Sequence, residues 1–233
     1  MPAAAASASS PGLPPDDGFA QHLRGFGPIG ILAILVILAS NLVTVLLSAV
    51  LVLLWARRSG TPWREIGYVR PKSWIGSLAI GLVFGTAFKL VMKIIVMPLL
   101  GADPINHPYH YLVGNRAALP GILFSLIVGA GFGEETVYRG YMFERLGKLL
   151  GPGWKAKSSI VLLTAAIFAL AHYSVQGLAG SEQAMITGTV FGVIFLVTGS
   201  LWLPMCAHAA FDLTSLAIIY WDLETAVAHL VFK

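Results

Sequence analysis

The stretch 120-PGILFSLIVGAGFGEETVYRGYMFERL-146 runs from apolar and small residues directly into two adjacent carboxylates, Glu134 and Glu135. Its first half contains no charged side chain and is typical of a helix inside a lipid bilayer. An ionised carboxylate is costly to bury in hydrocarbon, so two of them in such a helix indicate function more than packing. We therefore predict a membrane helix from about Leu119 to Leu149 that carries the chemistry of this protein.

The whole chain has the composition of a membrane protein. Of its 233 residues, 57% are hydrophobic and 11% are charged, whereas roughly a quarter of the residues of soluble domains are charged. Apolar runs long enough to cross a lipid bilayer recur along the chain. The sequence predicts an all-α fold, a polytopic transmembrane bundle of about six helical spans. The net charge of +4 is too small and too dispersed to indicate a nucleic-acid partner.

Four segments follow from the distribution of apolar residues. Residues 1–27 form an Ala-, Ser- and Pro-rich tract that we predict to be a disordered tail, without the basic and compact apolar regions of a cleaved signal peptide. Residues 28–117 are expected to hold two spans with a linker and a loop, residues 118–222 a catalytic helical core, and residues 223–233 a C-terminal tail. The expected spans are 28–55, 74–100, 119–149, 158–175, 182–199 and 201–221.

Basic residues concentrate in two of the connecting segments. The linker between residues 57 and 72 carries five arginines and lysines against the single acidic residue Glu65, and a second basic cluster lies between Arg145 and Lys157. By the positive-inside rule, both segments face the cytoplasm. Six spans would then leave both termini outside.

The second expected span contains two glycines and two lysines. Gly81 and Gly85 have the spacing that lets two helices approach closely. We expect the side chains of Lys89 and Lys93 to snorkel towards the interface, and the alternative is that they line a polar cavity.

The carboxylates of the opening stretch differ in their expected partners. Adjacent residues on a helix point about 100° apart, so Glu134 and Glu135 do not share one environment. Glu135 and Arg139 are four residues apart and lie on one helix face, where they can form a neutralising ion pair. This structural pair would leave Glu134 free for chemistry.

Two further helices contribute ionisable side chains. His208 and Asp212 are also four residues apart, so the carboxylate can hold the imidazole in one orientation. His172 lies near the end of another expected span, and Phe168, one turn before it, is expected to pack beside it.

One glutamate and two histidines on three helices can perform chemistry on water. A buried carboxylate such as Glu134 can act as a general base, while His172 and His208 can share the water, shuttle a proton or stabilise an oxyanion. The same three side chains could instead hold a divalent metal such as zinc, because imidazole and carboxylate groups are zinc ligands. The residues themselves leave both possibilities open.

These residues also carry a family resemblance. The segments 134-EETVYR-139, 168-FALAH-172 and 208-HAAFD-212 resemble the EExxxR, FxxxH and HxxxN or HxxxD motifs of the CPBP family of intramembrane proteases. This family includes CAAX prenyl proteases and bacteriocin-processing proteins, and it is also called the abortive-infection family. The resemblance covers about residues 118–222, with the three motifs in the family's order.

The resemblance implies peptide-bond hydrolysis within the membrane. Glu134 and His172 would activate a water molecule, and His208 with Asp212 would stabilise the tetrahedral oxyanion. The implied substrate is a membrane-embedded or lipidated protein or peptide, such as a prenylated CAAX protein, and the expected location is the bacterial plasma membrane. Family members are commonly labelled metalloproteases, although the chemistry described above requires no metal.

One position departs from the prenyl-protein proteases. They have an asparagine that can donate a hydrogen bond to an oxyanion, whereas Asp212, when ionised, can only accept one. Asp212 would then orient His208, be protonated, or help to bind a metal.

Two other classes of function use similar residues. A proton-coupled transporter could employ the buried carboxylate and histidines as a relay, although the chain shows no internal repeat that would build a transport site. A non-catalytic scaffold or bacteriocin-immunity protein could retain these residues for stability alone.

Overall fold

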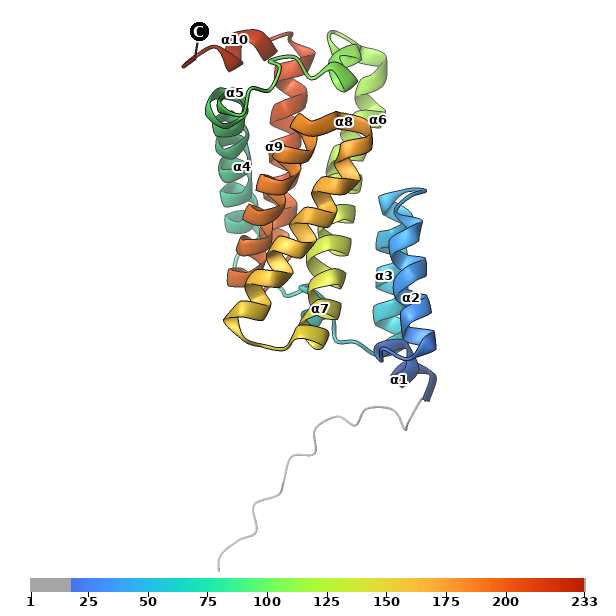
Figure 1. The fold of residues 1–233 in the computed structure, drawn as a ribbon. Coiled ribbons are helices and arrows are strands. Elements are labelled where there is room, and N and C mark those ends of the chain that lie inside the picture. The colour runs from blue at the N-terminus through green and yellow to red at the C-terminus, as the bar shows by residue number, and fades with distance from the viewer. Residues whose placement is uncertain (1–17, 233) are drawn as a thin grey trace, which may run out of the picture.

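The computed structural model describes residues 18–232, and the regular secondary structure of this part is helical, without strands. The all-α prediction is confirmed. Figure 1 shows the helices as an elongated bundle. The elements are α1 (Gly18–Arg24), α2 (Pro28–Ser40), α3 (Val45–Ser59), η1 (Trp63–Ile66), α4 (Trp74–Val91), η2 (Met92–Val96), α5 (Met97–Leu99), η3 (His107–Leu112), η4 (Arg116–Ala118), α6 (Leu119–Phe124), η5 (Ser125–Tyr141), α7 (Met142–Leu150), α8 (Trp154–Thr198), α9 (Trp202–Tyr220) and α10 (Glu224–Ala228).

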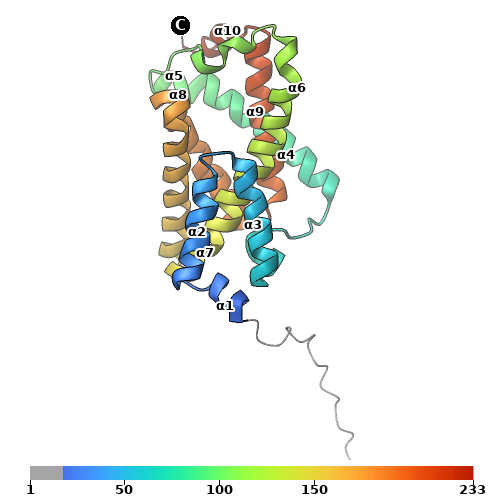
Figure 2. The same ribbon diagram turned by 90° about the vertical axis from the view of Figure 1, so that its right-hand side faces the viewer.

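The first predicted span, residues 28–55, is wrong as a single helix. The chain turns back between α2 and α3, and the Ser48 hydroxyl donates a 2.6 Å hydrogen bond to the carbonyl oxygen of Ile37 across the two helices. With 13 and 15 residues, each helix is about 20 Å long, shorter than the roughly 30 Å hydrocarbon layer. Figure 2 shows this α2–α3 hairpin in front of the bundle, where it stops short of the end that carries α10.

Helix α8 folds back on itself at Gly177, whose φ of 63° and ψ of −159° are not helical. The two resulting arms coincide with the spans expected at 158–175 and 182–199. Ser181 on the second arm donates a 2.9 Å hydrogen bond to the carbonyl oxygen of Ala169 on the first, so the arms run antiparallel. A side chain at a positive φ is strained, which favours glycine at this turn.

The number of spans is close to the prediction of about six without matching it. Within residues 18–232, four helices are long and apolar enough to cross a membrane, or five if the bent pair α1 and α2 forms one span. One of the four is α8, which contributes two arms because of the turn at Gly177. The chain is therefore a multi-pass membrane protein.

Helices α4 and α9 make the most extensive contact between any two helices of the described structure. A Cβ atom added to Gly81 would lie 2.5 Å from Cβ of Cys206, and one added to Gly85 would lie 2.1 Å from the carbonyl oxygen of Ala207. The predicted close approach at these two glycines is confirmed. This contact fixes the position of α9, which carries His208 and Asp212.

The two ends of the bundle differ in charge. In Figure 1, α1, the linker after α3 and the turn between α7 and α8 lie at one end, while α5 and α10 lie at the other. The first end holds both basic segments. Arg145 of α7 donates a 2.7 Å hydrogen bond to the carbonyl oxygen of Arg24, which fastens α1 to this end.

This arrangement corrects two expectations about the ends of the chain. Residues 18–24, expected within the disordered tail, form α1, while residues 1–17 lie outside the described part. The α2–α3 hairpin returns the chain to the side from which it came, so α1 and α10 lie at opposite ends of the bundle instead of the same one. The expected C-terminal tail contains α10, in which Glu224 is buried.

Candidate active site

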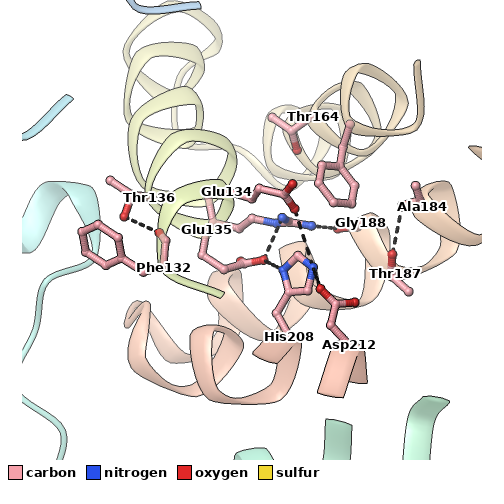
Figure 3. A network of polar contacts seen from close by, with 12 residues as sticks. Phe132, Glu134, Glu135, Thr136, Thr164, Ala184, Thr187, Gly188, His208 and Asp212 are labelled. Atoms are coloured by element: carbon pink, nitrogen blue, oxygen red, sulfur yellow. Dashed lines mark hydrogen bonds and ion pairs between the residues drawn. The ribbon is translucent and has the colours of Figure 1, made fainter. Parts of the chain in front are cut away.

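The two adjacent glutamates lie in the middle of η5, a π-helical segment of 17 residues within the continuous helical run from Leu119 to Leu150. The predicted helix therefore continues past Arg139, but its central part is wider than an α-helix. π-Helical segments are rare and are frequent at functional sites. Figure 3 shows side chains of η5 pointing towards His208 and Asp212 of α9.

Glu135 accepts two strong hydrogen bonds on one oxygen. Its Oε1 receives Arg139 Nη1 at 2.9 Å and His208 Nδ1 at 2.6 Å. The Glu135 side chain is fully buried, and that of Arg139 is 1% exposed. Arg139 also donates to the carbonyl oxygen of Gly188 on α8 at 3.2 Å, and its guanidinium lies over the ring of Phe168. Glu135 and Arg139 therefore connect η5 with both α8 and α9.

Glu134 has a different environment. Within the described residues, its buried Oε2 atom has no hydrogen-bond partner. His208 Nε2 lies 3.6 Å from this oxygen and 3.7 Å from Asp212 Oδ2, beyond the range of a direct hydrogen bond. Because buried polar atoms are usually satisfied, this arrangement indicates a place for a small polar molecule beside Glu134.

Helix α8 brings the second histidine to the same place. His172 Nδ1 donates a 2.8 Å hydrogen bond to the carbonyl oxygen of Phe168, which leaves Nε2 available for other contacts. The ring of Phe168 lies 4.4 Å from that of His172 and 6.0 Å from that of His208, measured between centroids. The expected contact between Phe168 and His172 is confirmed.

A cavity of about 320 Å³ connects these side chains. Glu134, His172, His208 and Asp212 all line it, so the structure gathers the four predicted catalytic residues around one space. Its lining also includes residues of α3, α6 and η3. Burial raises the pKa of Tyr109, which lines the cavity from η3, so its phenol remains neutral.

Sequence reasoning missed the contact between His208 and Glu135. It assigned the orientation of His208 to Asp212, whereas the bonded carboxylate is Glu135 on another helix. Spacing within one helix could not show this contact, because it depends on how η5 and α9 pack.

The expected snorkelling of Lys89 is also wrong. The residue is 5% exposed, lies on the packed side of α4 and lines a second cavity together with Lys93. A signal existed in the sequence, because Gly81, Gly85 and Lys89 repeat every four residues and therefore share one helix face.

Glu134, His172 and His208 have the side-chain types of zinc ligands. Zinc is bound by three or four ligands at about 2.0–2.3 Å. In the part of the chain that the structure describes, no group of three or more His, Cys, Asp or Glu side chains is arranged to hold a metal ion. As placed, Glu134, His172 and His208 do not form such a ligand set.

Comparison with known proteins identifies the region that holds the site. Residues 116–214 match the family model described as Rce1-like, type II CAAX prenyl endopeptidase Rce1-like. No curated protein and no solved structure matches the chain. The matched residues include all three motifs and every side chain of the site, and the family implies a protease of membranes. Residues 116–214 are therefore similar to the Rce1-like type II CAAX prenyl endopeptidases, the protease family that the three motifs indicate.

Proposed function

We propose that this protein is an intramembrane endopeptidase in which Glu134 is the general base. The observation that carries the proposal is the buried Oε2 atom of Glu134, which faces His208 Nε2 across 3.6 Å with no partner of its own. A water molecule beside this oxygen would be held for attack on a peptide carbonyl. A carboxylate within hydrogen-bond reach of a water molecule can act as its general base.

His172 assists at the same water. Its Nδ1 atom is occupied by the Phe168 carbonyl, so the ring orientation is fixed and Nε2 is the atom free to accept or return a proton. In the proposed reaction, Glu134 takes the proton of the attacking water and the hydroxide adds to the carbonyl carbon. When the tetrahedral intermediate collapses, the carbonyl re-forms, the C–N bond breaks, and the proton passes from Glu134 to the leaving amine nitrogen.

His208 stabilises the oxyanion. The Nδ1–H group donates to Glu135, which fixes the ring and favours a charged imidazolium, since Asp212 lies 3.7 Å from Nε2 as a second anion. The protonated Nε2 can donate to the developing oxyanion. Asp212, which cannot donate when ionised, thus supports the donor instead of replacing it.

The proposed substrate is a membrane-associated protein or peptide, including a prenylated protein with a CAAX-like end. The family match and the position of the site within apolar helices support this substrate class. We propose the bacterial plasma membrane as its location.

The test is hydrolysis of a farnesylated CAAX-type peptide by purified protein in detergent or vesicles, together with a search of membrane proteomes for new C-termini. Glu134→Gln should abolish cleavage, because the amide cannot accept the proton from water. Glu65→Gln is the matched control, because it makes the same chemical change in a carboxylate of the linker. Glu65 lies 2.9 Å from Lys148 Nζ, and this variant should retain cleavage.

Two outcomes would overturn the proposal. Cleavage by Glu134→Gln at the wild-type rate would remove Glu134 from the reaction. Absence of cleavage by the wild type, together with unchanged membrane proteomes, would favour the transporter or scaffold. A chelator added in parallel tests the need for a metal.

A further inference from the structure

A second cavity of about 170 Å³ adjoins the catalytic one. The two cavities share part of their lining, including Asn106, Gln176 and Gln183. The second cavity also holds two lysines, Lys89 and Lys93, which are on the side of α4 and η2 that faces the bundle. It therefore extends the catalytic space towards these two lysines, with Asp103 and Glu224 also in its lining.

The two lysines differ in how their charges are compensated. Lys93 Nζ lies 3.7 Å from Glu224 Oε1 and also donates to the carbonyl oxygen of Pro104. Glu224 accepts from the Asn106 backbone N–H at 2.8 Å and contacts His110 Nδ1 at 3.2 Å. Lys93 therefore belongs to a buried polar group that already contains an anion.

Lys89 has no such partner. Its Nζ donates to Gln183 Oε1 at 2.9 Å and lies 4.9 Å from the centroid of the Phe211 ring. Within residues 18–232, no carboxylate lies within 4 Å of this ammonium group, although Asp212 and Glu224 act on it from farther away. A buried cation is costly unless an anion compensates it, and an ammonium has three donors, of which Gln183 uses one.

The position of Lys89 determines how far an anion bound to it would lie from the catalytic side chains. Phe211, which contacts Lys89, directly precedes Asp212 on α9, and Gly85, one turn before Lys89, packs against Ala207, which directly precedes His208. Lys89 is thus one to two helical turns from the catalytic side chains, roughly 5–10 Å. An extended peptide covers this distance in about two or three residues at 3.3 Å each.

We propose that Lys89 binds the C-terminal carboxylate of the peptide that is cleaved, two or three residues beyond the scissile bond. This inference rests on the proposed function, because it assigns a substrate contact to the same site. A single carboxylate suits this place better than a phosphate, since one uncompensated cation is present and Glu224 would repel a second negative charge. The shared lining of the two cavities gives the peptide a continuous path from Lys89 to Glu134.

The experiment compares two peptides that differ only at the C-terminus, a free acid and an amide, with wild-type protein and Lys89→Gln. The wild type should cleave the acid with a kcat/KM about 10- to 100-fold higher, the range expected for a charge-assisted hydrogen bond. Lys89→Gln keeps a donor towards Gln183 but loses the charge, so the preference should fall below about threefold through slower cleavage of the acid alone.

Three further measurements serve as controls for this comparison. Lys148→Gln removes the same charge from the exposed pair with Glu65 and should keep the full preference for the acid. An amidated peptide with aspartate as its last residue distinguishes the terminal carboxylate from a side-chain carboxylate, and it should be cleaved like the amide. Binding of both peptides, labelled with a fluorophore, to Glu134→Gln protein measures the same preference without hydrolysis.

The outcomes separate this inference from the proposed function. Equal cleavage of acid and amide by the wild type would overturn the role of Lys89, whereas the proposed protease function would stand. This comparison uses the wild type alone, so it does not depend on the folding of a variant. If Lys89→Gln cleaves the acid and the amide more slowly by the same factor, the role of Lys89 is also overturned. If the wild type cleaves neither peptide, the proposed function fails. The binding of the acid and the amide to Glu134→Gln protein then tests the carboxylate site without hydrolysis: tighter binding of the acid supports the site, and equal binding overturns it.

Discussion

At the scale of single residues, the two adjacent glutamates have opposite relations to their surroundings. Glu135 is bonded through Oε1 to Arg139 and His208, whereas Glu134 Oε2 lies 3.6 Å from His208 Nε2. In both residues, the Oε2 atom has no hydrogen-bond partner within the described structure. Loss of charge should therefore have different effects on stability at the two positions.

We predict that Glu134→Gln leaves the free energy of unfolding near that of the wild type, whereas Glu135→Gln lowers it by about 3–5 kcal/mol. Removing one member of a buried ion pair leaves the other charge without compensation, while removing an uncompensated charge relieves a desolvation cost. Arg139→Ala should destabilise the protein to a similar degree. Thermal unfolding of the purified variants in detergent provides the measurement.

The contrary result is equally clear. If Glu134→Gln unfolds at a far lower temperature than Glu135→Gln, then Glu134 is the structural carboxylate and the roles of the two glutamates are exchanged. Activity alone could not show this, because both variants are expected to be inactive.

The sequence predicted those parts of the site that depend on spacing within one helix. The four-residue separation of Glu135 and Arg139 placed them on one face, and the structure pairs them at 2.9 Å. The bond between Glu135 and His208 joins residues 73 positions apart on different helices. No local pattern encodes such a contact, because packing between helices determines it.

At the scale of elements, the turn at Gly177 sets the position of His172, which lies five residues before it on the first arm of α8. We predict that Gly177→Ala lowers the free energy of unfolding by roughly 1–3 kcal/mol, because the positive φ is strained for alanine. Cleavage should fall as well, since a shifted turn displaces the imidazole.

A matched control is Gly147→Ala in α7. A Cβ atom at this helical position would have no neighbour within 4 Å, so alanine should be neutral or slightly stabilising. Melting temperature and kcat measured for both variants make the comparison. Equal stability of Gly177→Ala and the wild type would show that the turn is not needed to fold α8.

The same elements show where hydrophobic patterns suffice and where they do not. The apolar runs predicted two separate spans at 158–175 and 182–199, which coincide with the two arms of α8 on either side of Gly177. The turn between α2 and α3 contains Leu42 and Val43, which are 91% and 78% exposed on the described surface. Leu42 and Val43 continue the apolar run through the turn, so residues 28–55 read as one span although Asn41 and Thr44, the N-cap of α3, lie within it.

At the scale of the whole molecule, the two basic segments lie at one end and α10 at the other. We predict that the basic end faces the cytoplasm and the α10 end faces outwards. Single cysteines placed at exposed positions in a Cys206→Ala background would report this by their reaction with a membrane-impermeant thiol reagent. Arg58→Cys and Lys155→Cys should be protected in intact cells, and Asp103→Cys should be labelled.

Permeabilised cells provide the control, since all three cysteines should react there. Labelling of Arg58→Cys and Lys155→Cys in intact cells, with protection of Asp103→Cys, would reverse the orientation. Opposite labelling of Arg58→Cys and Lys155→Cys would contradict the arrangement of the helices itself, because the structure places both residues at the same end.

The cavity that Glu134 lines also bears on the order in which the reactants of the proposed hydrolysis would assemble. Its volume of about 320 Å³ leaves room for several water molecules. A peptide that extended from Lys89 to Glu134, as we propose, would displace much of that solvent. The water molecule that attacks the peptide would then have to lie beside Glu134 before the peptide binds. In kinetic terms, the proposed protease would take up two substrates in a fixed order, and the hydration of the empty site would decide whether a bound peptide reacts or dissociates unchanged.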